Sequence, residues 1–151
     1  MEHAEKTIET TAFGGGCFWC IEAVFLELKG VAAVTSGYAG GSTPHPTYEQ
    51  VSMGATGHAE VIQIEYDPSV IPFKKLLEVF FASHDPTAVN RQGNDVGTQY
   101  RSVLFFTTEK QEREAEQYIR GLAAAKKYGS PIVTEVVPLA AFYPAEEYHK
   151  D

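Results

Sequence analysis

The stretch "FGGGCFWCIEAVF", Phe13–Phe25, restricts the possible folds of this chain more than any other part of the sequence. Three consecutive glycines interrupt regular structure because they have no side chain to pack and lose the most conformational freedom on folding. Thr7–Phe13, before them, alternates and is rich in β-branched residues, whereas Cys17–Leu28, after them, has apolar residues at helical spacing. The sequence therefore predicts a strand, a glycine turn and a helix with Cys17 at its N-terminus.

Strands and helices continue to alternate after this unit. We expect further strands at 31–38, 59–66, 103–108 and 131–139, and helices at 47–54, 72–83 and 109–128. Residues 84–102 form a long polar loop, and a loop of that length in a compact domain is usually functional or disordered. This order predicts an α+β fold, a two-layer sandwich of helices on a mixed β-sheet with ferredoxin-like topology. No repeat or linker interrupts the chain, so we expect one domain spanning residues 1–151.

The composition excludes several classes of partner. The 151 residues suffice for one core, and 44% hydrophobic with 21% charged residues is typical of globular proteins. A net charge of −8 without a basic cluster argues against nucleic acid and anionic membranes. The start "MEHAEKTIETT" lacks the features of a signal peptide, and no apolar run approaches the ~20 residues that span a bilayer. We expect a cytoplasmic monomer.

Both cysteines of the chain, Cys17 and Cys20, lie in this opening helix as a CxxC pair. A helix N-terminus favours a thiolate, and residues three apart in a helix lie ~5–6 Å apart, within disulfide reach. A structural zinc site would need four ligands, and "GGGCFWC" lacks the spacing of a phosphate-binding loop. The pattern favours redox chemistry, although two small buried hydrophobic side chains remain an alternative.

Phe18 and Trp19 lie between the two thiols. An apolar wall beside a nucleophile selects an apolar group of a substrate, which is our interpretation of Trp19. Phe18 taken alone is equally well explained as a core residue.

Seven segments of this sequence resemble one known family, and they occur in its order along the chain. They are "GGGCFWC", "SGYAGG", "PTYEQV", "GHAEVIQIEYDP", "HDPT", "NRQGNDVGTQYRS" and "FYPAEEYH", between Ile8 and His149. The family is that of the methionine sulfoxide reductases of the A type. The resemblance implies reduction of the S epimer of methionine sulfoxide, free or in proteins, by a catalytic domain. Cys17 would attack the sulfoxide sulfur and become a sulfenic acid, and Phe18 and Trp19 would hold the S-methyl group.

The resemblance also assigns roles to four polar residues. Glu60 matches the acid that protonates the sulfoxide oxygen, and Tyr38, Asp95 and Tyr100 match groups that position that oxygen or the acid. A carboxyl can supply a proton near neutral pH only if burial raises its pKa. Without the resemblance, Glu60 would be a solvated carboxylate at a strand end, Asp95 a turn residue and Tyr38 a loop aromatic. The histidines at positions 58, 84 and 149 are interpreted as structural or supporting residues.

The chain departs from many relatives because it has no cysteine after Cys20. We therefore expect Cys20 to attack the Cys17 sulfenic acid, forming a disulfide that thioredoxin, or dithiothreitol in vitro, reduces. We expect no bound cofactor or metal. Two other functions stay open at this point: a thioredoxin-like disulfide oxidoreductase, and a non-enzymatic module that binds methionine-containing peptides.

Overall fold

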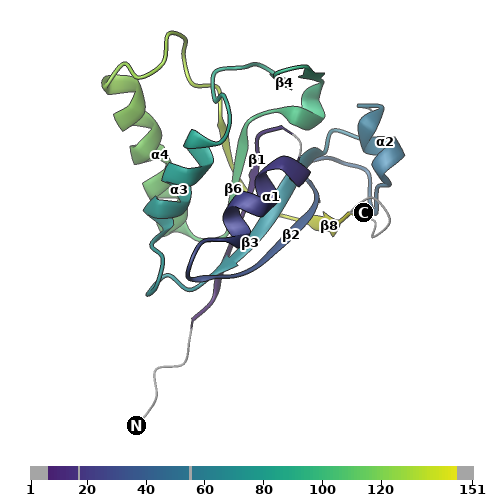
Figure 1. Cartoon of the computed structure of the whole chain (residues 1–151). Helices are drawn as coiled ribbons and strands as arrows, with labels where there is room; N and C mark the ends of the chain where they lie inside the picture. Colours follow the sequence, from purple (N-terminus) through teal and green to yellow (C-terminus); the bar gives the residue numbers. More distant parts are fainter. Residues whose placement is uncertain (1–6, 17, 55, 146–151) are drawn as a thin grey trace.

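The computed structural model describes residues 7–16, 18–54 and 56–145, without the side chains of Trp19 and Cys20. In chain order its elements are β1 (Glu9–Gly14), α1 (Phe18–Leu26), β2 (Val31–Ala39), α2 (Tyr48–Ser52), β3 (Ala59–Tyr66), α3 (Phe73–Ala82), β4 (Arg91–Gln92), β5 (Asp95–Val96), a 3-10 helix η1 (Thr98–Tyr100), β6 (Val103–Phe106), α4 (Glu109–Ala124), β7 (Glu135–Pro138) and β8 (Phe142–Pro144). Figure 1 shows α1, α3 and α4 packed against one sheet and α2 to one side of it. A short hairpin, β4–β5, forms a second, two-stranded sheet.

Four strands at the centre of the sheet have the ferredoxin-like order β6-β1-β3-β2, and each is antiparallel to its neighbours. Helix α1 connects β1 to β2, and α3 connects β3 to β6. One strand extends each edge: β7 pairs parallel with β6, and β8 pairs antiparallel with β2. The predicted α+β sandwich on a mixed sheet with ferredoxin-like topology is thus confirmed.

The main core lies between the helices and one face of the sheet, and it is rich in phenylalanine. Phe13 of β1 stacks on Phe80 of α3 with ring centroids 4.5 Å apart, and it meets Phe25 of α1 at 5.6 Å. All three side chains are fully buried. Burial of each such ring contributes about 1.5–3 kcal/mol, so this cluster fixes both helices to the strand that leads into the glycine turn.

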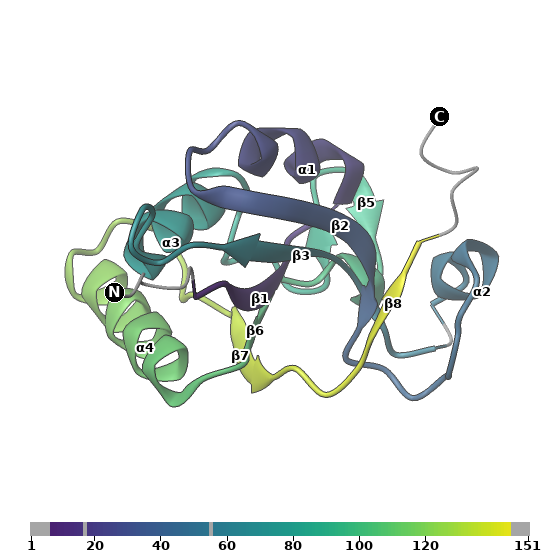
Figure 2. The same cartoon turned by 90° about the horizontal axis from the view of Figure 1, so that it is seen from below.

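The opposite face of the sheet carries a smaller core covered by the connection from β7 to β8. Val61, Val103 and Phe105 are buried there, and Leu139 and Phe142 pack on them. Figure 2 shows this connection crossing from one edge of the sheet to the other. Small residues beneath it permit the close approach: Ala12, Ala39 and Ala59.

Several expected boundaries differ in the structure. Helix α4 ends at Ala124 rather than at Tyr128, and Lys126 follows it with a positive φ of 53°. The strand expected at 131–139 is shorter in the structure and comprises only β7. The loop expected at 84–102 contains the β4–β5 hairpin, and the sequence did not predict β8. Among the described residues, no helix is long and apolar enough to cross a membrane.

Candidate active site

Glu60 is a buried carboxyl at the beginning of β3. Its side chain is only 1% exposed, and Tyr38 of β2 is its direct neighbour across the sheet. The backbone N–H of Phe18, the first residue of α1, donates to Oε1 of Glu60 at 3.4 Å. The Phe18 and Tyr38 rings lie 5.7 Å apart, and both are fully buried. The start of α1, β2 and β3 thus meet around one carboxyl.

The protonation of Glu60 follows from this environment. Burial raises the pKa of Glu60 from 4.5 to about 7, the Phe18 N–H opposes that rise, and the negative charge of Asp95 adds to it. Within the described part of the chain, Oε2 of Glu60 is buried without a hydrogen-bond partner. A carboxyl that is about half protonated at neutral pH can act as a general acid there.

The loop between α3 and β6 supplies the other expected polar residues. Asp95 lies on the exposed strand β5, opposite Gln92, and is close enough for its charge to act on Glu60. Tyr100 is half-buried at the end of η1, which contacts β3. The Gln99 side chain donates from Nε2 to the Ser52 carbonyl at 3.1 Å and so joins η1 to α2.

The three glycines form a turn with no room for side chains. A Cβ on Gly14 would lie 2.9 Å from Val103, and one on Gly15 would lie 2.7 Å from the His84 ring. Gly16 has a φ of +104° and lies against Gln92. The sequence needs glycine here because the chain passes between β6, the end of α3 and the β4–β5 hairpin just before α1 begins.

His84 lies against this turn and is held in place by a chain of hydrogen bonds. Its Nδ1 lies 2.7 Å from the Phe80 carbonyl, which only accepts, so Nδ1 carries the proton. Its Nε2 accepts from Ser102 Oγ at 2.7 Å, and Ser102 Oγ lies 2.7 Å from Thr134 Oγ1. Burial lowers the pKa of His84, which keeps the ring neutral near neutral pH.

His58 supports the loop that follows β2. The Gly41 N–H donates to its Nδ1 at 3.0 Å, so Nε2 carries the proton and donates to the Thr43 carbonyl at 2.6 Å. The ring meets Tyr143 of β8 edge-on at 5.6 Å. His58 and His84 therefore occupy supporting positions, as predicted, whereas His149 lies outside the described residues.

The structure brings together only part of the predicted site. Phe18, Tyr38 and Glu60 are in contact or adjacent, and Asp95 acts on Glu60 through its charge. Cys17 lies outside the described residues, and Trp19 and Cys20 are described only as part of the backbone of α1. Sequence reasoning assigned no role to three supporting side chains. Gln92 and Ser102 lie within the recognised segment 90–102, whereas no motif marked Thr134.

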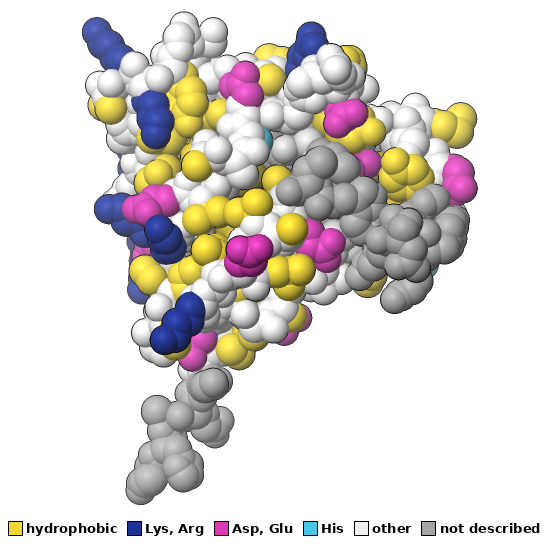
Figure 3. All heavy atoms as spheres, in the orientation of Figure 1, with side chains coloured by type: hydrophobic (Ala, Val, Ile, Leu, Met, Phe, Trp, Pro, Cys, Tyr) yellow, Lys and Arg dark blue, Asp and Glu magenta, His cyan; other side chains and the backbone are white. Residues whose placement is uncertain are grey.

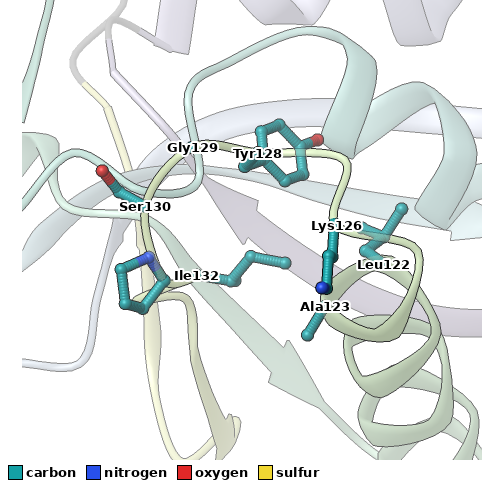
Figure 4. A pocket seen from close by; sticks show the side chains of 8 residues that line it. Leu122, Ala123, Lys126, Tyr128, Gly129, Ser130 and Ile132 are labelled. Carbon is teal, nitrogen blue, oxygen red and sulfur yellow. The ribbon is translucent and has the colours of Figure 1, made fainter.

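A separate pocket lies away from this site. It has a volume of about 220 Å³ and is formed by the end of α4 and the connection to β7, where Leu122, Tyr128 and Ile132 line it. Figure 4 shows Leu122 and Ile132 directed into this space. None of the predicted site residues lines the pocket, so we do not assign the reaction to it.

Known proteins match nearly the whole of this chain. The profile of the family "Peptide methionine sulfoxide reductase" matches residues 9–151. The peptide methionine sulfoxide reductase MsrA of Haloquadratum walsbyi is 59% identical over 143 residues, which cover 95% of this chain and 81% of that protein.

Two solved structures of Mxr1 from Saccharomyces cerevisiae share the fold. The reduced form has a TM-score of 0.88 and 35% identity, with 98% of this chain and 85% of that chain covered. The complex of Mxr1 with Trx2 has a TM-score of 0.69 and 26% identity, with 97% and 87% covered. From the profile match over residues 9–151 and the relative of 59% identity, we conclude that this chain belongs to the peptide methionine sulfoxide reductase A family.

Proposed function

We propose that this protein reduces the S epimer of methionine sulfoxide, free or in proteins, with Cys17 as nucleophile and Glu60 as the acid. The single observation that carries the proposal is the geometry at the start of α1. Glu60, with a pKa of about 7, accepts a hydrogen bond from Phe18, the residue directly after Cys17. Because Cys17 directly precedes Phe18 in the sequence, this contact supports an acid that acts beside the proposed nucleophile.

The first step transfers the sulfoxide oxygen to Cys17. The thiolate attacks the sulfoxide sulfur while protonated Glu60 gives its proton to the sulfoxide oxygen, because a bare oxide cannot leave. The hydroxyl then passes to the Cys17 sulfur as the bond between the two sulfurs breaks and methionine leaves. Cys17 becomes a sulfenic acid, so the substrate sulfur is reduced as the cysteine is oxidised. Tyr38, Asp95 and Tyr100 orient the oxygen or hold the proton on Glu60, and Phe18 and Trp19 enclose the methyl group.

The second step converts the Cys17 sulfenic acid to a disulfide, which a dithiol can then reduce. The Cys20 thiol attacks the Cys17 sulfenic sulfur, water leaves, and a disulfide forms across one helical turn. A protein dithiol of the thioredoxin type then reduces this disulfide to two thiols through a mixed disulfide. The yeast relative Mxr1, solved in complex with Trx2, supports this choice of reductant. We further propose that the chain is one catalytic domain that acts as a cytoplasmic monomer without a bound cofactor.

The test is turnover of L-methionine-S-sulfoxide by the parent and by Cys20→Ser, each driven by thioredoxin. The parent should cycle, whereas the variant should release about one equivalent of methionine and then stall with Cys17 oxidised. Mass spectrometry of the peroxide-treated parent should find a Cys17–Cys20 disulfide. Equal cycling by parent and variant would remove Cys20 from the mechanism, and a parent without turnover would refute the proposed function.

A further inference from the structure

Helix α1 is apolar on all sides although it lies at the surface. Its nine residues, "FWCIEAVFL", include a single charged residue, whereas the exposed sides of α3 and α4 are rich in lysine and glutamate. Its outer side chains Val24 and Leu26 are 44% and 55% exposed. A helix that is hydrophobic all round is normally covered, so its exposed side indicates a contact with another molecule.

A groove runs between this exposed side of α1 and helix α3. Its volume is about 380 Å³, and its walls are largely apolar. Val24 of α1 and the α3 residues Val79 and Ala82 line it, as does Ser83 after the end of α3. Lys75 and Glu78 of α3 also line it and form an ion pair of 3.8 Å. Figure 3 shows hydrophobic side chains gathered over α1 and α3 with charged groups at their edges.

The groove lies next to the segment that carries the cysteine pair. Ser83 directly precedes His84, whose ring lies against Gly15, two residues before Cys17. Val24 is six residues after the start of α1, which corresponds to roughly 9 Å along the helix axis. A protein bound over the first turn of α1 would therefore also cover the groove.

We propose that the groove between α1 and α3 is the docking surface for the protein dithiol that reduces the Cys17–Cys20 disulfide. This inference rests on the proposed function, because that function needs a partner thiolate to reach a sulfur at the start of α1. Weak redox encounters bury less than about 1,200 Å² in total, with an apolar centre and a polar rim. A largely apolar groove that also contains the charged pair Lys75 and Glu78, with Val24 four residues after Cys20 in the sequence, fits that pattern.

The experiment compares two reductants of different size on the same oxidised enzyme. Val24→Glu and Ala82→Glu each place a charge on one wall of the groove, from α1 and from α3. Val70→Glu is the matched control, since Val70 is 49% exposed in the turn after β3, at the end of the sheet opposite Glu60. Turnover is measured with a recombinant thioredoxin, recycled by its reductase and NADPH, and separately with dithiothreitol.

We expect both groove variants to raise the KM for thioredoxin by about fivefold or more. Turnover driven by dithiothreitol should stay within about twofold of the parent, because a small dithiol needs no docking surface. An unchanged ratio of thioredoxin-driven to dithiothreitol-driven activity in both variants would overturn the proposal. So would a parent dimer that Val24→Glu converts to monomer, since the groove would then join two copies. Failure of the proposed function itself would appear differently, as a parent that does not turn over with dithiothreitol.

Discussion

Glu60 shows how the surroundings of one residue determine its chemistry. A glutamate at the start of a strand is ordinarily solvated and ionised at neutral pH. Here the strand start lies under α1, so burial raises the pKa of Glu60 to about 7. The Phe18 N–H, which favours the carboxylate, keeps the pKa from rising further. The two influences leave a carboxyl that can both give up a proton and regain it near neutral pH.

Replacing Glu60 with Gln should slow the first release of methionine by about 10²–10⁴-fold, because the amide cannot supply the proton. Since Glu60 loses its proton as pH rises through its pKa, the ratio of parent to variant rates should be constant well below pH 7. Above about pH 7 it should fall about tenfold per pH unit. Single-turnover quench measurements on both sides of pH 7 would determine this ratio.

Glu65→Gln is the matched control, because Glu65 lies on the same strand and is half-buried. It should leave both the rate and its pH dependence close to those of the parent. A parent-to-Glu60→Gln ratio that is the same at every pH would contradict the assignment of Glu60 as the acid.

At the scale of elements, the turn between β1 and α1 is the most constrained segment. Gly14 lies against Val103 of β6, Gly15 against His84 and Gly16 against Gln92 of β4. His84 is held in place by two hydrogen bonds. The turn thus fixes where α1 begins relative to β3. This placement brings the Phe18 N–H to Glu60.

Gly15→Ala should lower the free energy of unfolding by about 1–3 kcal/mol, because the new methyl group would lie 2.7 Å from the His84 ring. It should also lower the rate of methionine release by shifting the start of α1. Urea denaturation and single-turnover kinetics measure the two effects.

Gly121→Ala, in α4, is the control for Gly15→Ala. No atom lies within 4 Å of the added Cβ, and alanine is a better helix former than glycine. This variant should gain about 0.5–1 kcal/mol of stability with unchanged activity. A Gly15→Ala protein as stable as the parent would contradict the steric account of the turn.

At the scale of the whole molecule, the C-terminal part of the chain completes the sheet that carries the site. The connection from β7 to β8 covers the smaller core, and β8 then pairs with β2 at Gly37, Tyr38 and Ala39. Tyr38 is therefore held between Glu60 on one side and Tyr143 on the other. Residues more than 80 positions apart in the sequence thus set the position of one site residue.

Phe142→Ala should destabilise the protein by about 2 kcal/mol, because the ring packs on the smaller core near Gly37. Amide hydrogen exchange should rise in β8 and in the adjoining residues 37–39 of β2, while β6 stays protected. Val133→Ala, at a 38% exposed position, is the control and should change neither quantity. Unchanged exchange in β2 would show that β8 does not hold that strand.

The sequence by itself determined the order and type of the main elements, the family and the identity of the cysteine pair. These depend on local periodicity and on motifs, which are contained in short segments such as Phe73–Ala82 with its regular apolar stripe. Only the tertiary structure decided the protonation of Glu60, the cover over the second face of the sheet and the existence of β8. Each of these depends on burial or pairing between distant segments. Val61 lies on the same face of β3 as the polar residues Gln63 and Glu65, a pattern typical of an exposed face, yet Phe142 and its neighbours bury it. Such long-range burial leaves no periodic signal in the residues that it encloses.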